Sequence, residues 1–121
     1  MWVPFLDVAE HRAGQGQRTF AYRFDWPAAA ANGALGACHG IDIPFTLGTL
    51  DRCGWAAFVG ADDDAVMLGR TLRRAWISVA SGEDPWPAYD PSRRATMIFD
   101  RRCRLEDDPR GAVRRAWRVE G

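Results

Sequence analysis

The sequence contains no lysine, no excess of charge of either sign and no long hydrophobic run. All 16 of its basic residues are arginines, and 16 acidic residues balance them, so no global field would attract nucleic acid or an anionic membrane. No apolar stretch is long enough to span a bilayer, and residues 1–4 lack the basic and apolar segments of a signal peptide. We therefore predict a cytoplasmic protein that binds neither nucleic acid nor membranes.

Cysteine is scarce and its spacing is uninformative. Cys38, Cys53 and Cys103 are odd in number and include no Cys-x-x-Cys pair, which argues against a disulfide framework and against a zinc site. Cys38 stands beside His39, but the partners of a thiol–imidazole pair normally meet in space from distant positions in the sequence. We interpret Cys38 as a small residue that fills a turn.

Apolar residues are plentiful enough to form a core. Hydrophobic residues make up 47% of the chain, a value typical of a globular protein rather than a disordered one. The 121 residues correspond to one domain or to part of one.

Local patterns predict the elements of the first half of the chain. Pro4 suits the first turn of a helix that ends in the glycine-rich residues 14–17. A strand follows from Arg18 to Trp26, with alternate aromatic residues on one face. Residues 48–60 are predicted to be irregular. Before them, one side of a short strand or helical turn is predicted to be buried by Ile41, Ile43, Phe45 and Leu47.

The second half is predicted to contain a long helix, a hairpin and a short helix. Three aspartates at 62–64 favour a helix N-terminus, and Gly82 favours its end. Residues 95–100 and 103–107 can pair as a hairpin, and a last short helix contains Val113 and Trp117. The long helix has one apolar face, which we predict to be buried and which consists of Leu68, Leu72, Ala75, Trp76 and Val79.

One histidine lies in a turn of small residues. His39 stands in Gly36-Ala37-Cys38-His39-Gly40, where the two glycines allow the backbone to bend sharply. The imidazole of histidine titrates at about 6.5 in unperturbed peptides, so a histidine held in such a turn can act as a general base. A purely structural role, in which the imidazole hydrogen-bonds within its loop, is the simpler interpretation of this short motif.

The wider sequence resembles the C-terminal part of the type B carboxylesterases, which are α/β-hydrolases related to the cholinesterases. The resemblance covers nearly the whole chain, in order. It rests on Thr19–Trp26, the Gly-Ala-Cys-His-Gly turn, Asp42–Phe45, Ala75–Ile77, Gly82–Pro85, Trp86–Pro91 and Arg94–Asp100.

The resemblance implies a fold and a role for two residues. Residues 1–121 would form the C-terminal part of an α/β-hydrolase domain, with the last core strand, the histidine loop, a long packing helix and a terminal β-hairpin. His39 would be the base of a Ser-His-acid triad. Asp42 would hydrogen-bond near the active site, and the alternative for Asp42 is a loop-capping aspartate.

The rest of a triad is missing from the sequence. In α/β-hydrolases the order is serine, acid, histidine, with the serine in a Gly-x-Ser-x-Gly turn, but Ser78, Ser81 and Ser92 all follow His39 and none stands in such a turn. Asp7 and Glu10 lie on a helix before the core strand, which is the wrong place for the family's acid. We therefore expect the isolated chain to be inactive.

The complete enzyme implied by the resemblance would hydrolyse a small carboxylic ester through an acyl-serine, without metal or organic cofactor. Its histidine segment would need a complementing N-terminal hydrolase fragment. Two alternatives stay open: a noncatalytic cholinesterase-like interaction module, against which the retention of His39 argues, and a standalone small protein or inactive gene remnant.

Overall fold

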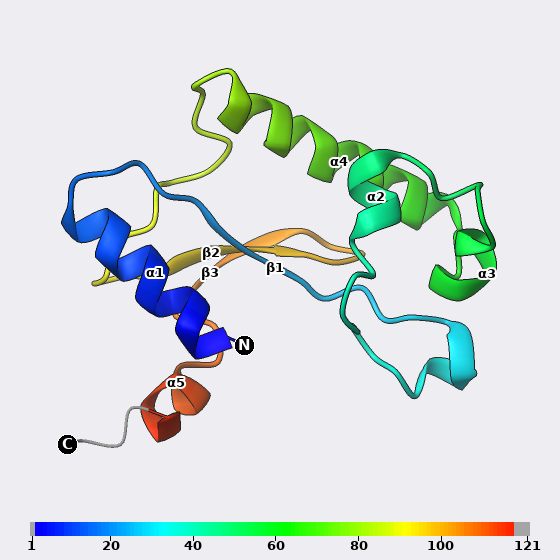
Figure 1. The fold of residues 1–121 in the computed structure, drawn as a ribbon, viewed down its shortest axis with the longest axis horizontal. Helices are drawn as coiled ribbons and strands as arrows, with labels where there is room; N and C mark the ends of the chain where they lie inside the picture. The colour runs from blue at the N-terminus through cyan, green and yellow to red at the C-terminus, as the bar shows by residue number, and fades with distance from the viewer. Residues whose placement is uncertain (1, 118–121) are drawn as a thin grey trace. The chain divides into compact units, whose positions relative to one another are not determined.

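The computed structural model describes residues 2–117. Its three strands form one sheet in the order β1-β2-β3. The elements, drawn in Figure 1, are α1 (Trp2–Gly14), β1 (Ala21–Phe24), the 3₁₀-helix η1 (Ala30–Gly33), α2 (Ile43–Leu47), α3 (Trp55–Val59), α4 (Asp63–Ala80), β2 (Ala95–Phe99), β3 (Arg104–Asp107) and α5 (Gly111–Trp117). In this part of the chain, no helix is both long and apolar enough to cross a membrane.

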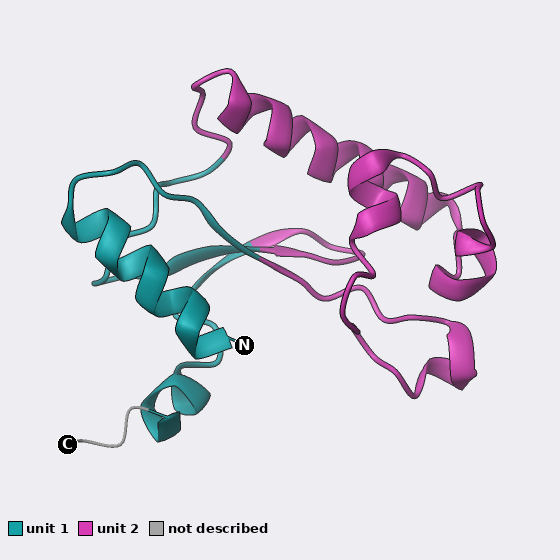
Figure 2. Cartoon of the chain, in the orientation of Figure 1, with its two compact units in different colours: residues 1–22, 86–97, 105–121 teal, residues 23–85, 98–104 magenta. Residues whose placement is uncertain are grey.

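The chain divides into two compact units (Figure 2). Unit 1 comprises residues 1–22, 86–97 and 105–121, and unit 2 comprises residues 23–85 and 98–104. The core of unit 1 is formed by Leu6 and Ala9 of α1 together with Ala21 and Tyr89. The Tyr89 amide donates to the Thr19 carbonyl over 2.7 Å, which ties the extended segment after residue 85 to the segment that leads into β1.

The core of unit 2 is built around two aromatic rings. Trp26 and Phe45 are 1% and 0% exposed, and their ring centroids lie 5.6 Å apart. The guanidinium of Arg73 on α4 donates to the Phe45 carbonyl over 2.8 Å, so α2 is held against α4. Each of these contacts joins segments that are distant in the sequence.

The long helix α4 matches its prediction at both ends. The Asp62 carboxylate accepts a hydrogen bond from the Ala65 amide over 2.9 Å, and Gly82 adopts a φ of +81° just beyond the helix. On the predicted apolar face, Leu68 and Leu72 are buried, but Trp76 and Val79 are 50% and 42% exposed. Only the first half of that face is therefore covered within the described residues.

Three other predictions need correction. The strand predicted over residues 18–26 is shorter, because only Ala21–Phe24 are in β1; Trp26 is buried beyond its end. Residues 43–47 form a helix, which places Ile43 and Leu47, four residues apart, on one exposed side. Residues 55–59, predicted to be irregular, form α3. The first helix, the hairpin β2–β3 and the last helix are confirmed.

Candidate active site

The segment that leads from β1 to the histidine is a loop closed at its neck. The Ala28 amide donates to the Gly36 carbonyl over 2.9 Å, so the chain returns to its starting point after eight residues. Ala28 is 1% exposed, and Gly36 adopts a φ of +55°, which an L-residue with a side chain rarely adopts. The neck is thus a fixed point only three residues before His39.

The histidine itself lies in a tight turn that leads into α2. The Ile41 amide donates to the Cys38 carbonyl over 3.3 Å, and the Ile43 amide donates to the Gly40 carbonyl over 3.1 Å. Gly40 has a φ of +76°, as the sequence predicted for a turn that needs glycine. Ile41 is buried and anchors the turn, while the His39 side chain is exposed.

Helix α3 holds the start of the same loop through its carbonyl groups. The last carbonyls of a helix have no partner within it, and here two of them are satisfied from outside. The Trp26 indole N–H donates to the Val59 carbonyl over 2.8 Å, and the Ala29 amide donates to the Phe58 carbonyl over 2.9 Å. The sequence patterns gave no sign of this role for residues 55–60.

Asp42 stands at the N-terminus of α2 without capping it. Its side chain accepts no capping hydrogen bond, and its carbonyl accepts from the amide and the hydroxyl of Thr46 over 2.9 and 3.0 Å. The carboxylate is half-buried and is not engaged by a helix amide. The Asp42 side chain therefore does not cap α2.

No triad is assembled within residues 2–117. None of the three serines hydrogen-bonds to His39 in this part of the chain: the Ser92 hydroxyl donates to Asp90, and Ser78 and Ser81 lie in and just after α4. Glu10 forms an ion pair with Arg94 at 3.0 Å. The thiols of all three cysteines are free, and no cluster of three or more His, Cys, Asp or Glu residues suited to a metal ion occurs among the described residues.

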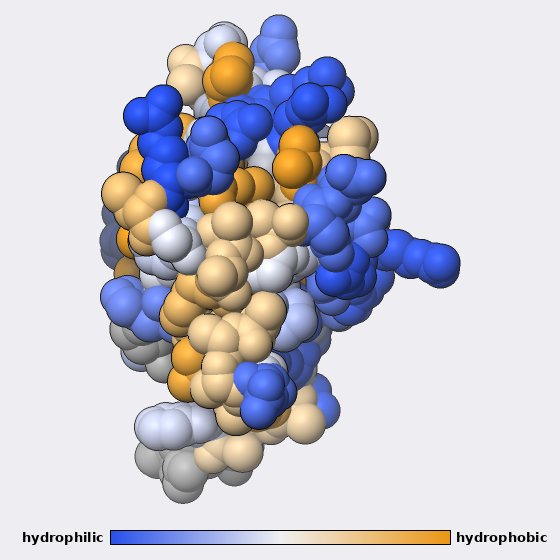
Figure 3. Space-filling model, turned by 90° about the vertical axis from the view of Figure 1, so that its right-hand side faces the viewer, coloured by the Kyte–Doolittle hydropathy of each residue, from blue (hydrophilic) through white to orange (hydrophobic). Residues whose placement is uncertain are grey.

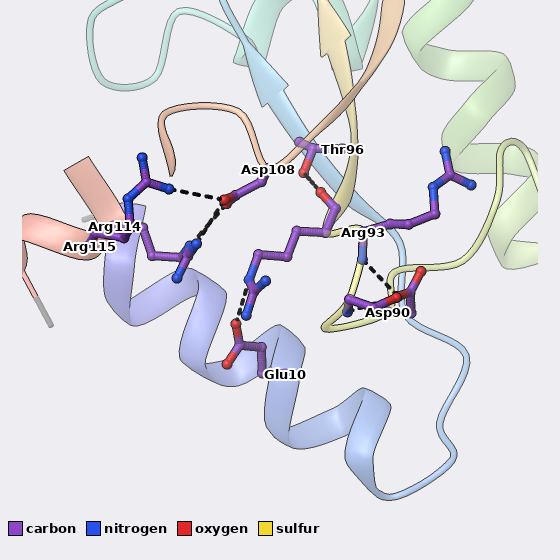
Figure 4. Close-up of polar contacts among 9 residues, drawn as sticks. Glu10, Asp90, Arg93, Thr96, Asp108, Arg114 and Arg115 are labelled. Atoms are coloured by element: carbon purple, nitrogen blue, oxygen red, sulfur yellow. Dashed lines mark hydrogen bonds and ion pairs between the residues drawn. The ribbon is translucent and has the colours of Figure 1, made fainter. Parts of the chain in front are cut away.

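A second polar cluster, in unit 1, is structural (Figure 4). Asp108 accepts two hydrogen bonds from Arg114, over 2.9 and 2.8 Å. These bonds hold the pKa of the Asp108 carboxyl below its ordinary value. Arg93 pairs with Asp107 at 3.0 Å. Because these charges satisfy one another, the cluster resembles a network that fastens elements together rather than a binding site.

Exposed apolar side chains occur within a few residues of His39 in the sequence. Leu35, Ile43 and Leu47 are 49%, 47% and 68% exposed. Figure 3 shows a band of hydrophobic residues along one face of the molecule, flanked by hydrophilic ones. A contiguous exposed apolar patch, where it is large, marks a surface that binds a ligand or another polypeptide.

Comparison with known proteins identifies the relatives of this chain. No family model matches the sequence. The chain is 34% identical over 120 residues to the para-nitrobenzyl esterase of Bacillus subtilis (strain 168), covering 93% of this chain and 24% of that protein. It is 36% identical over 100 residues to the phenmedipham hydrolase of Pseudarthrobacter oxydans, covering 75% of this chain and 20% of that protein.

The solved structures agree with the sequence matches. A para-nitrobenzyl esterase superposes with a TM-score of 0.82 at 30% identity, over 95% of this chain and 24% of that one. A carboxylesterase of Geobacillus stearothermophilus superposes with a TM-score of 0.78 at 34% identity, over 93% and 24% respectively. The chain thus spans about a quarter of the length of the relatives it matches.

These similarities define the class of protein first. The fold is that of a portion of an α/β-hydrolase. Within that class, the chain is similar to para-nitrobenzyl esterase and to a carboxylesterase over about a quarter of their length, which agrees with the C-terminal part of a type B carboxylesterase that the sequence predicted.

Proposed function

We propose that residues 1–121 are the C-terminal part of a carboxylesterase type B domain and that His39 is its catalytic base. The observation that carries the proposal is the exposed side chain of His39, in a turn whose Cys38 and Gly40 carbonyls accept from the Ile41 and Ile43 amides, in a chain homologous to ester hydrolases over 93% of its length. The serine and the acid would come from polypeptide outside these residues.

The proposed chemistry needs a base that can take up and return a proton. The serine Oγ attacks the ester carbonyl carbon while His39 accepts the hydroxyl proton; the ester C–O bond then breaks, and His39 gives that proton to the departing alcohol. Water repeats the sequence on the acyl-serine, releasing the carboxylic acid and the free serine. The reaction consumes one ester and one water and calls for no metal or organic cofactor.

Asp42 has a supporting part in the proposal. Its half-buried carboxylate makes no capping bond and lies three residues after His39 in the same turn. We propose that it hydrogen-bonds near the imidazole once the site is complete.

The partner in the proposal is a complementing N-terminal hydrolase fragment. Two observations support it: the chain matches only about a quarter of its relatives' length, and the face of α4 that begins with buried Leu68 and Leu72 continues into exposed Trp76 and Val79. The substrate is proposed to be a small carboxylic ester bound on the apolar surface near His39.

A chimera tests the proposal. In it, the 121 residues replace the matching portion of the Bacillus subtilis para-nitrobenzyl esterase. We expect this chimera to hydrolyse a short-chain p-nitrophenyl ester, and His39→Ala to lower kcat by about three or more powers of ten, as removal of a triad member does. His11→Ala is the matched control, because His11 is exposed on α1 and should leave kcat unchanged.

The isolated chain provides the second arm of this experiment. We expect it to show no esterase activity above background, because it holds no Gly-x-Ser-x-Gly nucleophile. Full activity of the His39→Ala chimera would overturn the assignment of the base. A folded but inactive parent chimera would favour the noncatalytic interaction module instead.

A further inference from the structure

Where α3 contacts the loop of residues 28–36, there is no room for a side chain at residue 60. Gly60 follows α3 directly and adopts a φ of +68°. A Cβ atom built on Gly60 would lie 2.9 Å from the Cβ of Ala29, closer than real Cβ atoms approach one another. Glycine is therefore required here for space as well as for backbone conformation.

This close approach belongs to the same contact that holds the loop. The Phe58 carbonyl, two residues before Gly60, accepts the hydrogen bond from the Ala29 amide at 2.9 Å. Ala29 adjoins Ala28, whose own amide closes the loop neck on Gly36. A side chain at residue 60 would push Ala29 away from α3, and the displacement would reach the neck within one residue.

From this chain of contacts we infer that Gly60 is a positioning residue for His39. Because residue 60 has no side chain, the Ala29 amide can hydrogen-bond to the Phe58 carbonyl at the C-terminus of α3. Ala29 then holds its neighbour Ala28, whose hydrogen bond to Gly36 closes the loop before the histidine turn. The inference rests on the proposed function, because it takes His39 to be the base.

The test is Gly60→Ala in the active chimera. A misplacement of about 1 Å at a catalytic group can cost about a hundredfold in rate, so we expect kcat to fall between about tenfold and a hundredfold. KM should stay within about threefold, because the contact orients the base and not the substrate. Thermal melting of the same variant checks that the chimera is folded.

Two further variants distinguish displacement of Ala29 from the backbone strain of an alanine at positive φ. Gly54, at the other end of α3, has a φ of +75° but nothing within 4 Å of a built Cβ. Gly54→Ala therefore carries the same backbone cost without the collision, and we expect it to leave kcat almost unchanged. Ala29→Gly combined with Gly60→Ala removes the collision and should restore most of the lost kcat.

The outcomes are distinguishable from failure of the proposed function. If His39→Ala is inactive but Gly60→Ala is no worse than Gly54→Ala, or if Ala29→Gly restores nothing, the positioning role is wrong while the base stands. If His39→Ala is fully active, the proposed function itself is wrong. Should Gly60→Ala not fold, Ala29→Val adds bulk at the same contact from the other side and keeps every glycine in place. An unchanged kcat in Ala29→Val would overturn the inference.

A spectroscopic measurement gives a readout independent of turnover. In the His11→Ala background, His39 is the single histidine of these 121 residues, so its imidazole can be labelled by segmental ligation and followed by NMR in the chimera. We expect its resonance to shift in Gly60→Ala and to return in the double variant with Ala29→Gly. A resonance that is the same in all three proteins would contradict the inference.

Discussion

Two aspartates stand before helices in this chain, and only one of them acts as a cap. Asp62 has extended backbone, with φ −105° and ψ −175°, and its carboxylate accepts from the Ala65 amide. Asp42 already has helical backbone, with φ −75° and ψ −18°, and its carboxylate accepts no bond from the first turn. Because a capping side chain normally extends from a residue outside the helical region, the backbone at residue 42 frees this carboxylate for another use.

We predict that the two aspartates differ in what their removal does. Asp62→Ala in the chimera should speed hydrogen exchange at the first turn of α4, because the Ala65 amide loses its acceptor. Asp42→Ala should leave exchange at the first turn of α2 unchanged but should lower kcat. Asp62→Asn is the control, since it keeps the acceptor and weakens the pairing with Arg101 at 2.9 Å. Equal effects of Asp62→Ala and Asp42→Ala on their helices would contradict this.

At the scale of the element, the Asp108 carboxylate pairs with arginines of α5. Asp108 bonds twice to Arg114, and Arg115 lies 4.0 Å away, as Figure 4 shows. Asp108 has a φ of +46°, so the chain turns sharply there before the helix begins at Gly111. The short helix therefore depends on a charge pair rather than on buried side chains, since none of its residues is buried.

This dependence predicts a response to pH. Arg114, through its hydrogen bonds, lowers the pKa of Asp108 in the folded chain below the ordinary value of 3.8. A lowered folded pKa stabilises the pair above the ordinary pKa, and that stabilisation is lost as the pH falls through the folded pKa. We expect the protection factors of the amides of residues 111–117 in the chimera, which are corrected for intrinsic exchange, to fall as the pH drops below about 4, and Asp108→Asn to show low protection at every pH. Identical pH profiles would contradict this assignment.

The elements that could be predicted from the sequence are those with local signals. The aspartates at 62–64 and Gly82 mark α4, and the pattern around Arg101 marks the hairpin. The short length of β1 and the presence of α3 could not be predicted, because contacts far apart in the sequence decide them. Trp26 continues the aromatic alternation but lies beyond the end of β1, where its indole N–H donates to the carbonyl of Val59, 33 residues away.

In the candidate site too, the parts with local sequence signals could be predicted, and the parts set by distant contacts could not. The glycines around His39 were visible as a turn, and Gly36 and Gly40 have the positive φ values that such a turn needs. The hydrogen bond between the Ala29 amide and the Phe58 carbonyl of α3 joins backbone atoms, so no pattern of side chains could predict it. Its one visible sign is Gly60, and a lone glycine after an apolar run has many explanations.

At the scale of the whole molecule, the charge balance and the exposed apolar groups both favour association between copies of the chain. The chain has no net charge to keep copies apart, while Trp76, Ile77 and Val79 are 50%, 65% and 42% exposed at the end of α4. β1 pairs with β2 on one side, and its other side has no strand among the described residues. An open strand edge and an apolar patch both favour association.

We therefore predict that the isolated chain aggregates or lacks a single cooperative unfolding transition. Size-exclusion chromatography and denaturant melts measure both properties. Replacing Trp76 and Val79 together by glutamate should increase the fraction of monomer, because it removes the exposed half of the apolar face. A monodisperse wild-type monomer with one sharp transition would show that the 121 residues close a core unaided.

The closed neck at Ala28 and Gly36 has a consequence for how the loop between these residues can vary in length. The hydrogen bond between these residues returns the chain to a fixed point, and inside the loop the Gly36 amide donates to the Gly33 carbonyl over 3.1 Å. Surface loops tolerate insertions when their ends are held, so this one can lengthen or shorten while the imidazole keeps its place. Residues 30–35 are therefore where we expect changes of loop length to be tolerated, and a library of insertions between Asn32 and Gly33 tests this expectation.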